Sequence, residues 1–222
     1  MEKVGFIFDL DGVIVDTAKY HYLAWKKLAN ELGFEFTKEQ NELFKGVSRK
    51  RCLEILLDIG DIKATQKQFD TWMIEKNIDY LAYIEKMDSS EILPGVTRVL
   101  EYLKKRKIPI ALGSASKNAK PILEKVNLLS YFDSIVDGNS VTKAKPDPEV
   151  FLIAATNLSV TANLCVVFED AVAGIQAANA ANMLSVGIGD AEILQEADFN
   201  FNDFTEMSDS FLESLLIKGL NN

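Results

Sequence analysis

The sequence predicts an α/β fold, in which a doubly wound parallel sheet forms the core domain and an α-helical cap domain is inserted into it. Two observations predict the sheet: short apolar runs that are hydrophobic throughout, and helix-like segments that separate most of them. A third predicts the insertion, because about 100 residues lie between the first two runs, far more than one crossover needs.

The predicted strands are, in chain order, residues 4–8, 108–112, 134–136, 164–168 and 184–188. The predicted helices between the later strands are residues 96–106, 119–127, 149–157 and 171–182. Most of residues 19–86 show the pattern of amphipathic helices. We therefore expect the cap domain at residues 16–94 and the core domain at residues 1–15 and 95–222, with Pro94 and Gly95 marking the return to the core.

The composition is that of an ordered globular chain of 222 residues, with 48% hydrophobic and 26% charged residues. The net charge of −9 opposes binding to nucleic acid or to an anionic membrane, so we expect neither as a partner. Any anionic substrate must then be held by local cations.

Three further features favour a cytoplasmic protein. The first apolar run is too short for the core of a secretory signal. Two uncharged stretches, residues 150–168 and 171–189, are interrupted by Asn and Gln, so we expect no membrane span. Cys52 and Cys165 lack metal-ligand spacing, and we expect both to be reduced and buried.

Two carboxylates follow the first predicted strand, in the segment Phe8-Asp9-Leu10-Asp11-Gly12. Side chains at i and i+2 of an extended chain point to the same side, so Asp9 and Asp11 converge. Ligands bind at this edge of open α/β sheets, and two like charges there need a cation or a proton between them. The alternative is a solvated Asp-Gly turn, which the position directly after a buried run disfavours.

A second acidic pair, Glu169 and Asp170, follows the fourth predicted strand. The alternative role for Asp170 is to cap the helix that starts directly after it. Together with Asp9 and Asp11, however, four acids gather at one sheet edge, and an all-oxygen cluster with room for water is what Mg²⁺ requires. The sequence therefore predicts a magnesium site.

Cationic and hydrogen-bonding groups follow the other strands. The segment Ser114-Ala115-Ser116-Lys117-Asn118 places hydroxyls, an amide and free N–H groups before a helix, which predicts an anion site; a plain N-cap at Ser116 is the alternative. Lys145 lies in the loop before the next helix, where it could balance the acids and a bound phosphate, although a surface lysine is the alternative.

The predicted cap carries three weaker signals. The turn Lys45-Gly46-Val47-Ser48-Arg49 holds a guanidinium suited to phosphate binding. The only histidine, His21, taken alone favours a satisfied, partly buried side chain. The pair Lys76-Asn77 taken alone favours a solvated helix face.

These motifs, in this order, resemble those of the haloacid dehalogenase superfamily of phosphoryl-transfer enzymes across essentially the whole chain. The segment from Phe8 to Val13 is similar to its first motif, Ser114 to its second, Lys145 with Pro146 to its third and Glu169-Asp170 to its fourth. The insertion is similar to the small α-helical cap of that superfamily. The resemblance implies that Asp9 is the nucleophile, that Asp11 is a general acid and base, and that Ser114 and Lys145 offset charge on the transferring group. It implies Mg²⁺ ligands at Asp9, Asp11, Glu169 and Asp170.

A narrower resemblance, to the β-phosphoglucomutase family, rests on four segments. They are Asp16-Thr17-Ala18-Lys19-Tyr20-His21 with Ala24-Trp25, the turn at residues 45–49, residues 114–118, and Lys76-Asn77. Ala171 departs from that family, which often has Ser there, and we expect this to affect fine positioning rather than reaction type. The substrate-binding residues that the resemblance implies are Thr17, His21, Trp25, Gly46, Val47, Ser48, Arg49, Lys76, Ser114, Ala115, Ser116, Lys117, Asn118 and Lys145.

The activity that this resemblance implies is interconversion of β-D-glucose 1-phosphate and glucose 6-phosphate. It would proceed through an aspartyl-phosphate and glucose 1,6-bisphosphate, which is both intermediate and primer. Arg49 would hold the distal phosphate, His21 with Lys76 would read the sugar, and cap closure would exclude water. Two alternatives are a phosphatase for small sugar phosphates and a nonenzymatic phospho-acceptor resembling a receiver domain. We expect a monomer whose partners are small-molecule sugar phosphates.

Overall fold

The computed structural model describes residues 3–44 and 47–218. The chain divides into two compact units: Met1–Asp16 with Asp88–Asn222, which we call the sheet unit, and Thr17–Met87, which we call the helical unit. Within the described residues, no helix combines the length and the hydropathy needed to cross a membrane. Cys52 and Cys165 are both free and buried, as predicted.

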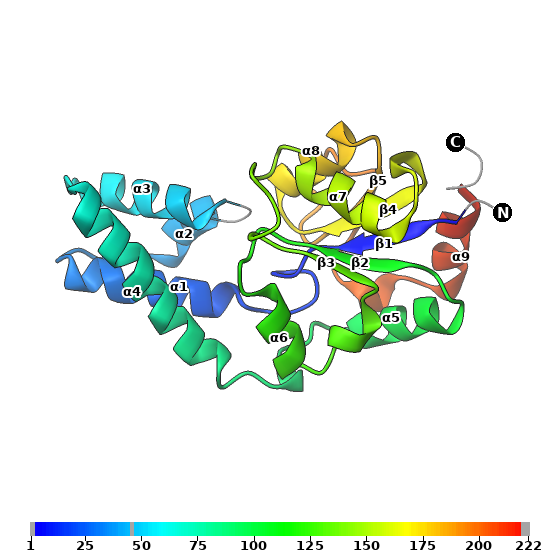
Figure 1. The fold of residues 1–222 in the computed structure, drawn as a ribbon, viewed down its shortest axis with the longest axis horizontal. Coiled ribbons are helices and arrows are strands. Elements are labelled where there is room, and N and C mark those ends of the chain that lie inside the picture. The colour runs from blue at the N-terminus through cyan, green and yellow to red at the C-terminus, as the bar shows by residue number, and fades with distance from the viewer. Residues whose placement is uncertain (1–2, 45–46, 219–222) are drawn as a thin grey trace. The chain divides into compact units, whose positions relative to one another are not determined.

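The sheet unit contains a parallel sheet of six strands in the order β3-β2-β1-β4-β5-β6 (Figure 1). The strands are β1 (Gly5–Phe8), β2 (Ile110–Gly113), β3 (Ser134–Val136), β4 (Cys165–Glu169), β5 (Leu184–Ile188) and β6 (Phe199–Phe201). This confirms the predicted doubly wound parallel sheet. β1 lies at its centre, where Ile7 is opposite both Ala111 and Val167.

Helices cover both faces of the sheet, with α7 and α8 on one side and α5 and α9 on the other (Figure 1). The helices of this unit are α5 (Val96–Lys105), α6 (Ala119–Lys125), α7 (Glu149–Leu158), α8 (Val172–Ala180) and α9 (Asp209–Lys218). Short 3-10 turns are Ser89–Glu91, Leu129–Tyr131, Ala162–Leu164 and Phe204–Glu206. Fully buried Ile7, Phe151 and Ala177 belong to the apolar cluster between the sheet and the first pair of helices. This packing fixes the positions at which the strands end.

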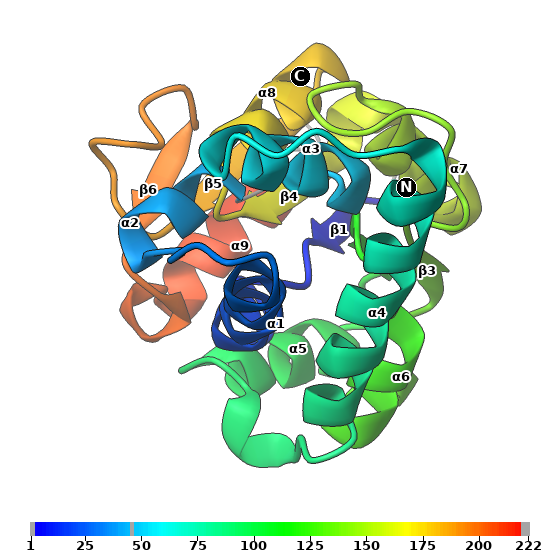
Figure 2. The same ribbon diagram turned by 90° about the vertical axis from the view of Figure 1, so that its left-hand side faces the viewer.

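The helical unit has its own apolar core, which includes Trp25, Leu28, Phe36, Leu53 and Leu56. Its elements are α1 (Ala18–Glu31), α2 (Lys38–Asn41), the 3-10 turn Glu42–Phe44, α3 (Arg49–Ile59) and α4 (Gln66–Ile84), and they are seen from a second side in Figure 2. α1 and α4 pack together, and an ion pair of 2.6 Å joins Lys27 to Asp79 across them.

The chain leaves and re-enters the sheet unit through two adjacent segments. Val15 forms an antiparallel bridge with Ile92, and the N–H of Asp16 donates to the carbonyl of Glu91 at 3.1 Å. Residues 88–94 therefore group with the sheet unit, whereas we had expected them in the cap. Pro94 and Gly95 mark the start of α5, where Gly95 is the N-cap at φ +81°, and not the boundary between the units.

Candidate active site

Three polar side chains lie at the carboxyl ends of three neighbouring strands. Asp9 directly follows β1, Ser114 follows β2, and Glu169 is the last residue of β4. All three are buried, with at most 7% of each residue exposed. Parallel strands end at the same edge of a sheet, so the strand order β2-β1-β4 places these residues side by side.

Lys145, from the loop before α7, joins this group. Its Nζ lies 2.6 Å from Asp9 Oδ1, 2.5 Å from Glu169 Oε1 and 3.1 Å from the carbonyl oxygen of Gly113. The alternative of a surface lysine is wrong, because Lys145 is 8% exposed. Burial alone would lower the pKa of Lys145, but the Asp9 and Glu169 carboxylates raise it above its ordinary value. The side chain is therefore a fixed ammonium ion between two acids.

Asp9 and Asp11 are linked through the backbone. The N–H of Asp11 donates to Asp9 Oδ2 at 3.0 Å, which holds the Asp9 carboxylate at the end of its strand. The following residue, Gly12, has φ +80°, and a Cβ there would lie 2.1 Å from Asp170 Oδ2. The segment is thus a tight turn against Asp170 and not a solvated Asp-Gly turn.

Glu169 and Asp170 differ in their surroundings. Glu169 Oε2 accepts from the N–H of Ala171 at 3.0 Å, and its carboxyl packs directly on Gly174 of α8. Burial, together with the carboxylates of Glu169, Asp9 and Asp11, raises the pKa of Asp170 well above its ordinary value. The N-cap of α8 is Ala171, which is buried and makes no side-chain capping bond, so the alternative of Asp170 as the cap is wrong.

The donor chemistry of this cluster fits Mg²⁺. The Lys145 ammonium pairs with Asp9 and Glu169. Repulsion from Glu169, Asp9 and Asp11 is a cause of the raised pKa of Asp170. Among the described residues, no group of three or more His, Cys, Asp or Glu side chains is arranged to hold a metal ion. Mg²⁺ commonly takes only one or two protein carboxylates and keeps waters or substrate phosphate as its other ligands. The oxygen set and its surplus of negative charge therefore suit this cation.

The turn between β2 and α6 carries the predicted anion site. Ser114 Oγ accepts from the N–H of Ser116 at 3.1 Å, and Ser116 Oγ accepts from the N–H of Asn118 at 3.3 Å. The N-cap of α6 is Asn118, without a side-chain capping bond, so the alternative of a plain N-cap at Ser116 is wrong. Ala115 and Lys117 are exposed. The turn is internally ordered, with one cationic side chain on its outer side.

In the helical unit, the structure brings His21, Trp25 and Lys76 together. Lys76 Nζ lies 2.8 Å from His21 Nδ1 and 4.7 Å from the ring centroids of both Trp25 and Tyr80. Lys76 is 1% exposed, so the alternative of a solvated face is wrong. Thr17, the N-cap residue of α1, is fully buried.

The protonation of His21 follows from these contacts. Burial, with the charges of Lys76 and Arg49, lowers the pKa of His21 well below its ordinary value. An ammonium has only donors, so Nδ1 of the neutral ring accepts from Lys76 and the ring proton is on Nε2. His21 thus presents one N–H donor.

The predicted turn before α3 is described only in part, since Lys45 and Gly46 lie outside the described residues. Val47 and Ser48 are partly buried, and Ser48 Oγ caps α3 by accepting from the N–H of Arg51 at 3.3 Å. Arg49 is the first residue of α3, and partial burial lowers its pKa. Among the described residues, no carboxylate contributes to the shift in the pKa of Arg49.

Several residues of these clusters were not predicted. Tyr80 is one helical turn after Lys76, a spacing that could have indicated the contact. Gly174 packs against Glu169, and Gly138 packs against Ala115 in the turn after β2. Glu149, which begins α7, accepts hydrogen bonds from the loop before Lys145. No local pattern distinguishes these last three.

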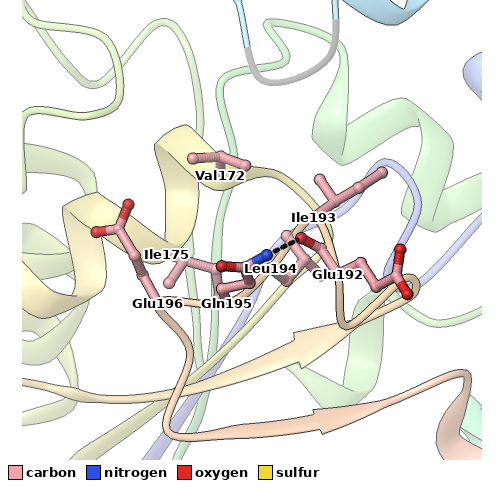
Figure 3. A pocket seen from close by; sticks show the side chains of 7 residues that line it. All are labelled: Val172, Ile175, Glu192, Ile193, Leu194, Gln195 and Glu196. Atoms are coloured by element: carbon pink, nitrogen blue, oxygen red, sulfur yellow. Dashed lines mark hydrogen bonds between the residues drawn. The ribbon is translucent and has the colours of Figure 1, made fainter.

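A pocket of about 290 Å³ in the sheet unit is lined by none of the predicted site residues (Figure 3). It is lined by Val172 and Ile175 of α8 and by Glu192, Ile193, Leu194, Gln195 and Glu196. Its charged groups are two carboxylates, and no lysine or arginine lines it. A phosphate would find no cation there, so this pocket is not the predicted anion site.

Comparisons with known proteins agree on the class of protein. The family model for haloacid dehalogenase-like hydrolases matches residues 6–188. A β-phosphoglucomutase of Bacillus subtilis (strain 168) is 43% identical over 194 residues, 86% of each chain. A phosphorylated carbohydrates phosphatase of Thermotoga maritima is 32% identical over 207 residues, 89% of this chain and 91% of its own. The crystal structure of a β-phosphoglucomutase from Clostridium difficile matches with a TM-score of 0.92 and 38% identity over 100% of both chains.

Proposed function

Because the chain belongs to the haloacid dehalogenase-like hydrolase family, we propose that it is a phosphomutase that interconverts β-D-glucose 1-phosphate and glucose 6-phosphate. The observation that carries phosphoryl transfer is the buried Asp9 carboxylate at the end of the central strand, paired with Lys145 and backed by further acids. The similarity to the two β-phosphoglucomutases favours the mutase reaction and this substrate.

In the proposed reaction, Asp9 attacks the phosphorus of a sugar bisphosphate. The bond from phosphorus to the sugar oxygen breaks as the aspartyl-phosphate forms, and Asp11 gives its proton to the leaving oxygen. In the second half, Asp11 takes a proton from a hydroxyl of the sugar monophosphate, and that hydroxyl attacks the aspartyl-phosphate. Asp9 is released as carboxylate, and glucose 1,6-bisphosphate is both intermediate and primer.

Other residues of the sheet unit support these steps. Lys145 holds the Asp9 carboxylate in place and supplies positive charge beside the transferring group. Ser114 Oγ accepts from the N–H of Ser116, so its own hydroxyl proton is the proposed donor to a phosphate oxygen. The proposed ligands of Mg²⁺ are the Asp9 and Asp170 carboxylates and the Asp11 carbonyl, with Glu169 bound directly or through water. When bound, this cation supplies charge stabilisation for the phosphoryl group.

Residues of the helical unit are the proposed recognition elements. Arg49 has a guanidinium suited to a distal phosphate, and the Nε2–H of neutral His21 is a donor for a sugar oxygen. Lys76 fixes the tautomer of His21 through the contact with Nδ1. These assignments complete the substrate-binding set expected from the sequence, which also includes Thr17, Trp25 and the turn before α3.

The test is a product assay with Mg²⁺, β-D-glucose 1-phosphate and a trace of glucose 1,6-bisphosphate. We expect glucose 6-phosphate with little inorganic phosphate, a lag that shortens when more primer is added, and poor use of the α anomer. Asp9→Asn, which removes the nucleophile, is the negative control.

The second candidate is a sugar-phosphate phosphatase, favoured by the similarity to the phosphatase of Thermotoga maritima. Release of inorganic phosphate in amounts equal to the substrate consumed, without glucose 6-phosphate, would establish that activity in place of the mutase. If the protein isomerises a different sugar phosphate, the proposed mechanism stands and the proposed substrate is wrong.

A further inference from the structure

We propose that Glu149 is a positioning residue for Lys145, because its carboxylate fixes the backbone of the loop that carries this lysine. The consequence for turnover rests on the proposed phosphoryl transfer. The consequence for the placement of the Lys145 side chain does not.

The clamp consists of three donor groups, on two residues, that hydrogen-bond to one carboxylate. Glu149 Oε2 accepts from the N–H of Thr142 at 2.8 Å and from the N–H of Lys143 at 2.6 Å. Glu149 Oε1 accepts from Thr142 Oγ1 at 2.9 Å. Hydrogen bonds lower the pKa of Glu149, and the bond from the N–H of Lys143 has the largest effect, ahead of those from the hydroxyl and N–H of Thr142. Burial acts in the opposite direction and raises this pKa. The group at the start of α7 is therefore an ionised acceptor.

Asp147 braces the interior of the same loop. Its N–H donates to the carbonyl of Ala144 at 3.0 Å, and its Oδ1 accepts from the N–H of Glu149 at 3.1 Å. Its Oδ2 lies 3.2 Å from Lys143 Nζ. The loop is thus closed between Thr142 and Glu149, with Lys145 near its middle.

The hydrogen bonds of this loop matter because they fix the backbone at Lys145. Its Nζ must reach three oxygens, from Asp9, Glu169 and Gly113, and it lies 4.8 Å from the ring centroid of Phe151 on α7. A lysine side chain loses rotamer entropy when it is held in one geometry. A loop backbone anchored to the first residue of α7 keeps the Lys145 Cα at a fixed place relative to that ring. Glu149 therefore acts on the acid pair only through Lys145.

The location of these hydrogen bonds distinguishes a positioning role for Glu149 from a role in the stability of the whole fold. Thr142 and Lys143 are exposed, and Glu149 is partly exposed, so the clamp lies outside the apolar core. We expect its removal to leave the fold intact while the loop gains freedom. Displacement of a catalytic group by about 1 Å can cost roughly 100-fold in rate.

The first experiment is a double-mutant cycle between Glu149→Ala and Lys145→Ala, assayed on the best substrate found. On the wild-type background we expect Glu149→Ala to lower kcat roughly 10- to 100-fold, with KM changed less than about 3-fold. On the Lys145→Ala background we expect no further loss, because residues that act through one another are not additive. Glu149→Gln, which keeps one acceptor oxygen, should recover part of the rate, and Glu124→Ala, at an exposed position of α6, is the matched control.

The second experiment does not need activity, so it still tests the clamp if the proposed function fails. Acylation of individual lysines by an amine-reactive ester is followed by mass spectrometry in the folded protein. We expect Lys145 to be labelled at least about 5-fold faster in Glu149→Ala than in wild type or Glu124→Ala, with Lys104 as an internal reference. Unchanged labelling of Lys145, or equal fractional losses of rate on both backgrounds of the cycle, would overturn the proposal.

Discussion

Gly174 gives the buried Glu169 carboxyl its space. A Cβ at residue 174 would lie 1.9 Å from Glu169 Cδ and 2.0 Å from its Oε1, the oxygen that pairs with Lys145. We expect Gly174→Ala to displace Glu169, to lower kcat/KM at least about 100-fold and to destabilise the sheet unit by about 1–3 kcal/mol. Steady-state kinetics and urea denaturation measure both effects. Val172→Ala, an exposed change in the same first turn of α8, should stay near wild type; wild-type kinetics for Gly174→Ala would contradict the argument.

The buried His21 makes the stability of the helical unit depend on pH. Its pKa is lowered well below 6.5, so in acid the unfolded chain binds a proton that the folded unit does not. Stability is therefore lost as the pH falls below about 6.5, by up to about 1.4 kcal/mol per pH unit. Trp25 and Trp72 are both in this unit, so their fluorescence follows its unfolding.

The control for this pH dependence is His21→Gln, which keeps an acceptor for Lys76 but cannot titrate. We expect the wild type to lose about 1–2 kcal/mol more than the variant between pH 7 and pH 5. Since His21 is the only histidine, the difference between the two curves isolates its proton. Parallel curves would mean that His21 is not held neutral by its surroundings.

At the scale of elements, the loop after β3 supports the turn after β2, which is the predicted anion site. The N–H of Gly138 donates to the Ser116 carbonyl at 3.1 Å, and a Cβ at Gly138 would lie 2.3 Å from the Ala115 carbonyl oxygen. The atom that this Cβ would approach most closely belongs to the backbone, so Gly138→Ala must shift the turn itself. We expect KM to rise about 10-fold or more with a smaller change in kcat. Asn139→Ala, which removes a 3.0 Å hydrogen bond to the Lys117 carbonyl, should have a weaker effect of the same kind. An unchanged KM in Gly138→Ala would show that this turn does not bind the substrate.

The strands buried on both faces could be predicted from the sequence, because their apolar runs are continuous. β6 was missed because its three residues alternate Phe, Asn and Phe at the sheet edge and are only partly buried. Helix α9 was not predicted either. The contact of Lys76 with Trp25 and Tyr80 could not be predicted, because the polar residues around Lys76 in α4 are typical of a solvated helix face.

The candidate site divides in the same way. Asp9, Ser114 and Glu169 follow predicted strands, so their convergence could be predicted because parallel strands end at one edge of the sheet. The pairing of Lys145 with Asp9 and Glu169 joins residues 136 and 24 positions apart in the chain, and only the fold fixes its geometry. The spaces at Gly138 and Gly174 likewise depend on atoms from other segments.

For the whole molecule, removal of Mg²⁺ should abolish activity, and its return should restore it. A cation that relieves repulsion between Asp170, Glu169 and Asp9 should also raise Tm, by a free energy that grows as RT ln(1 + [Mg²⁺]/Kd). Thermal denaturation with and without EDTA measures this shift independently of turnover. Removal of Mg²⁺ should lower the Tm of Asp170→Asn less than it lowers the Tm of the wild type. The variant should also lose most of the Mg²⁺-dependent rise in Tm. Full activity and an unchanged Tm in metal-free buffer would contradict a magnesium site.

The bridge between Val15 and Ile92 also bears on how such a chain can change over evolution. The two segments that join the helical insertion to the sheet unit are hydrogen-bonded to each other. The insertion therefore begins and ends at the same place in the sheet unit. Such an insertion can be shortened, lengthened or exchanged for another without changing the strand order, because the hydrogen bonds between residues 14–16 and 91–93 are retained. The junction is thus a natural grafting point, through which one sheet unit can acquire different helical insertions.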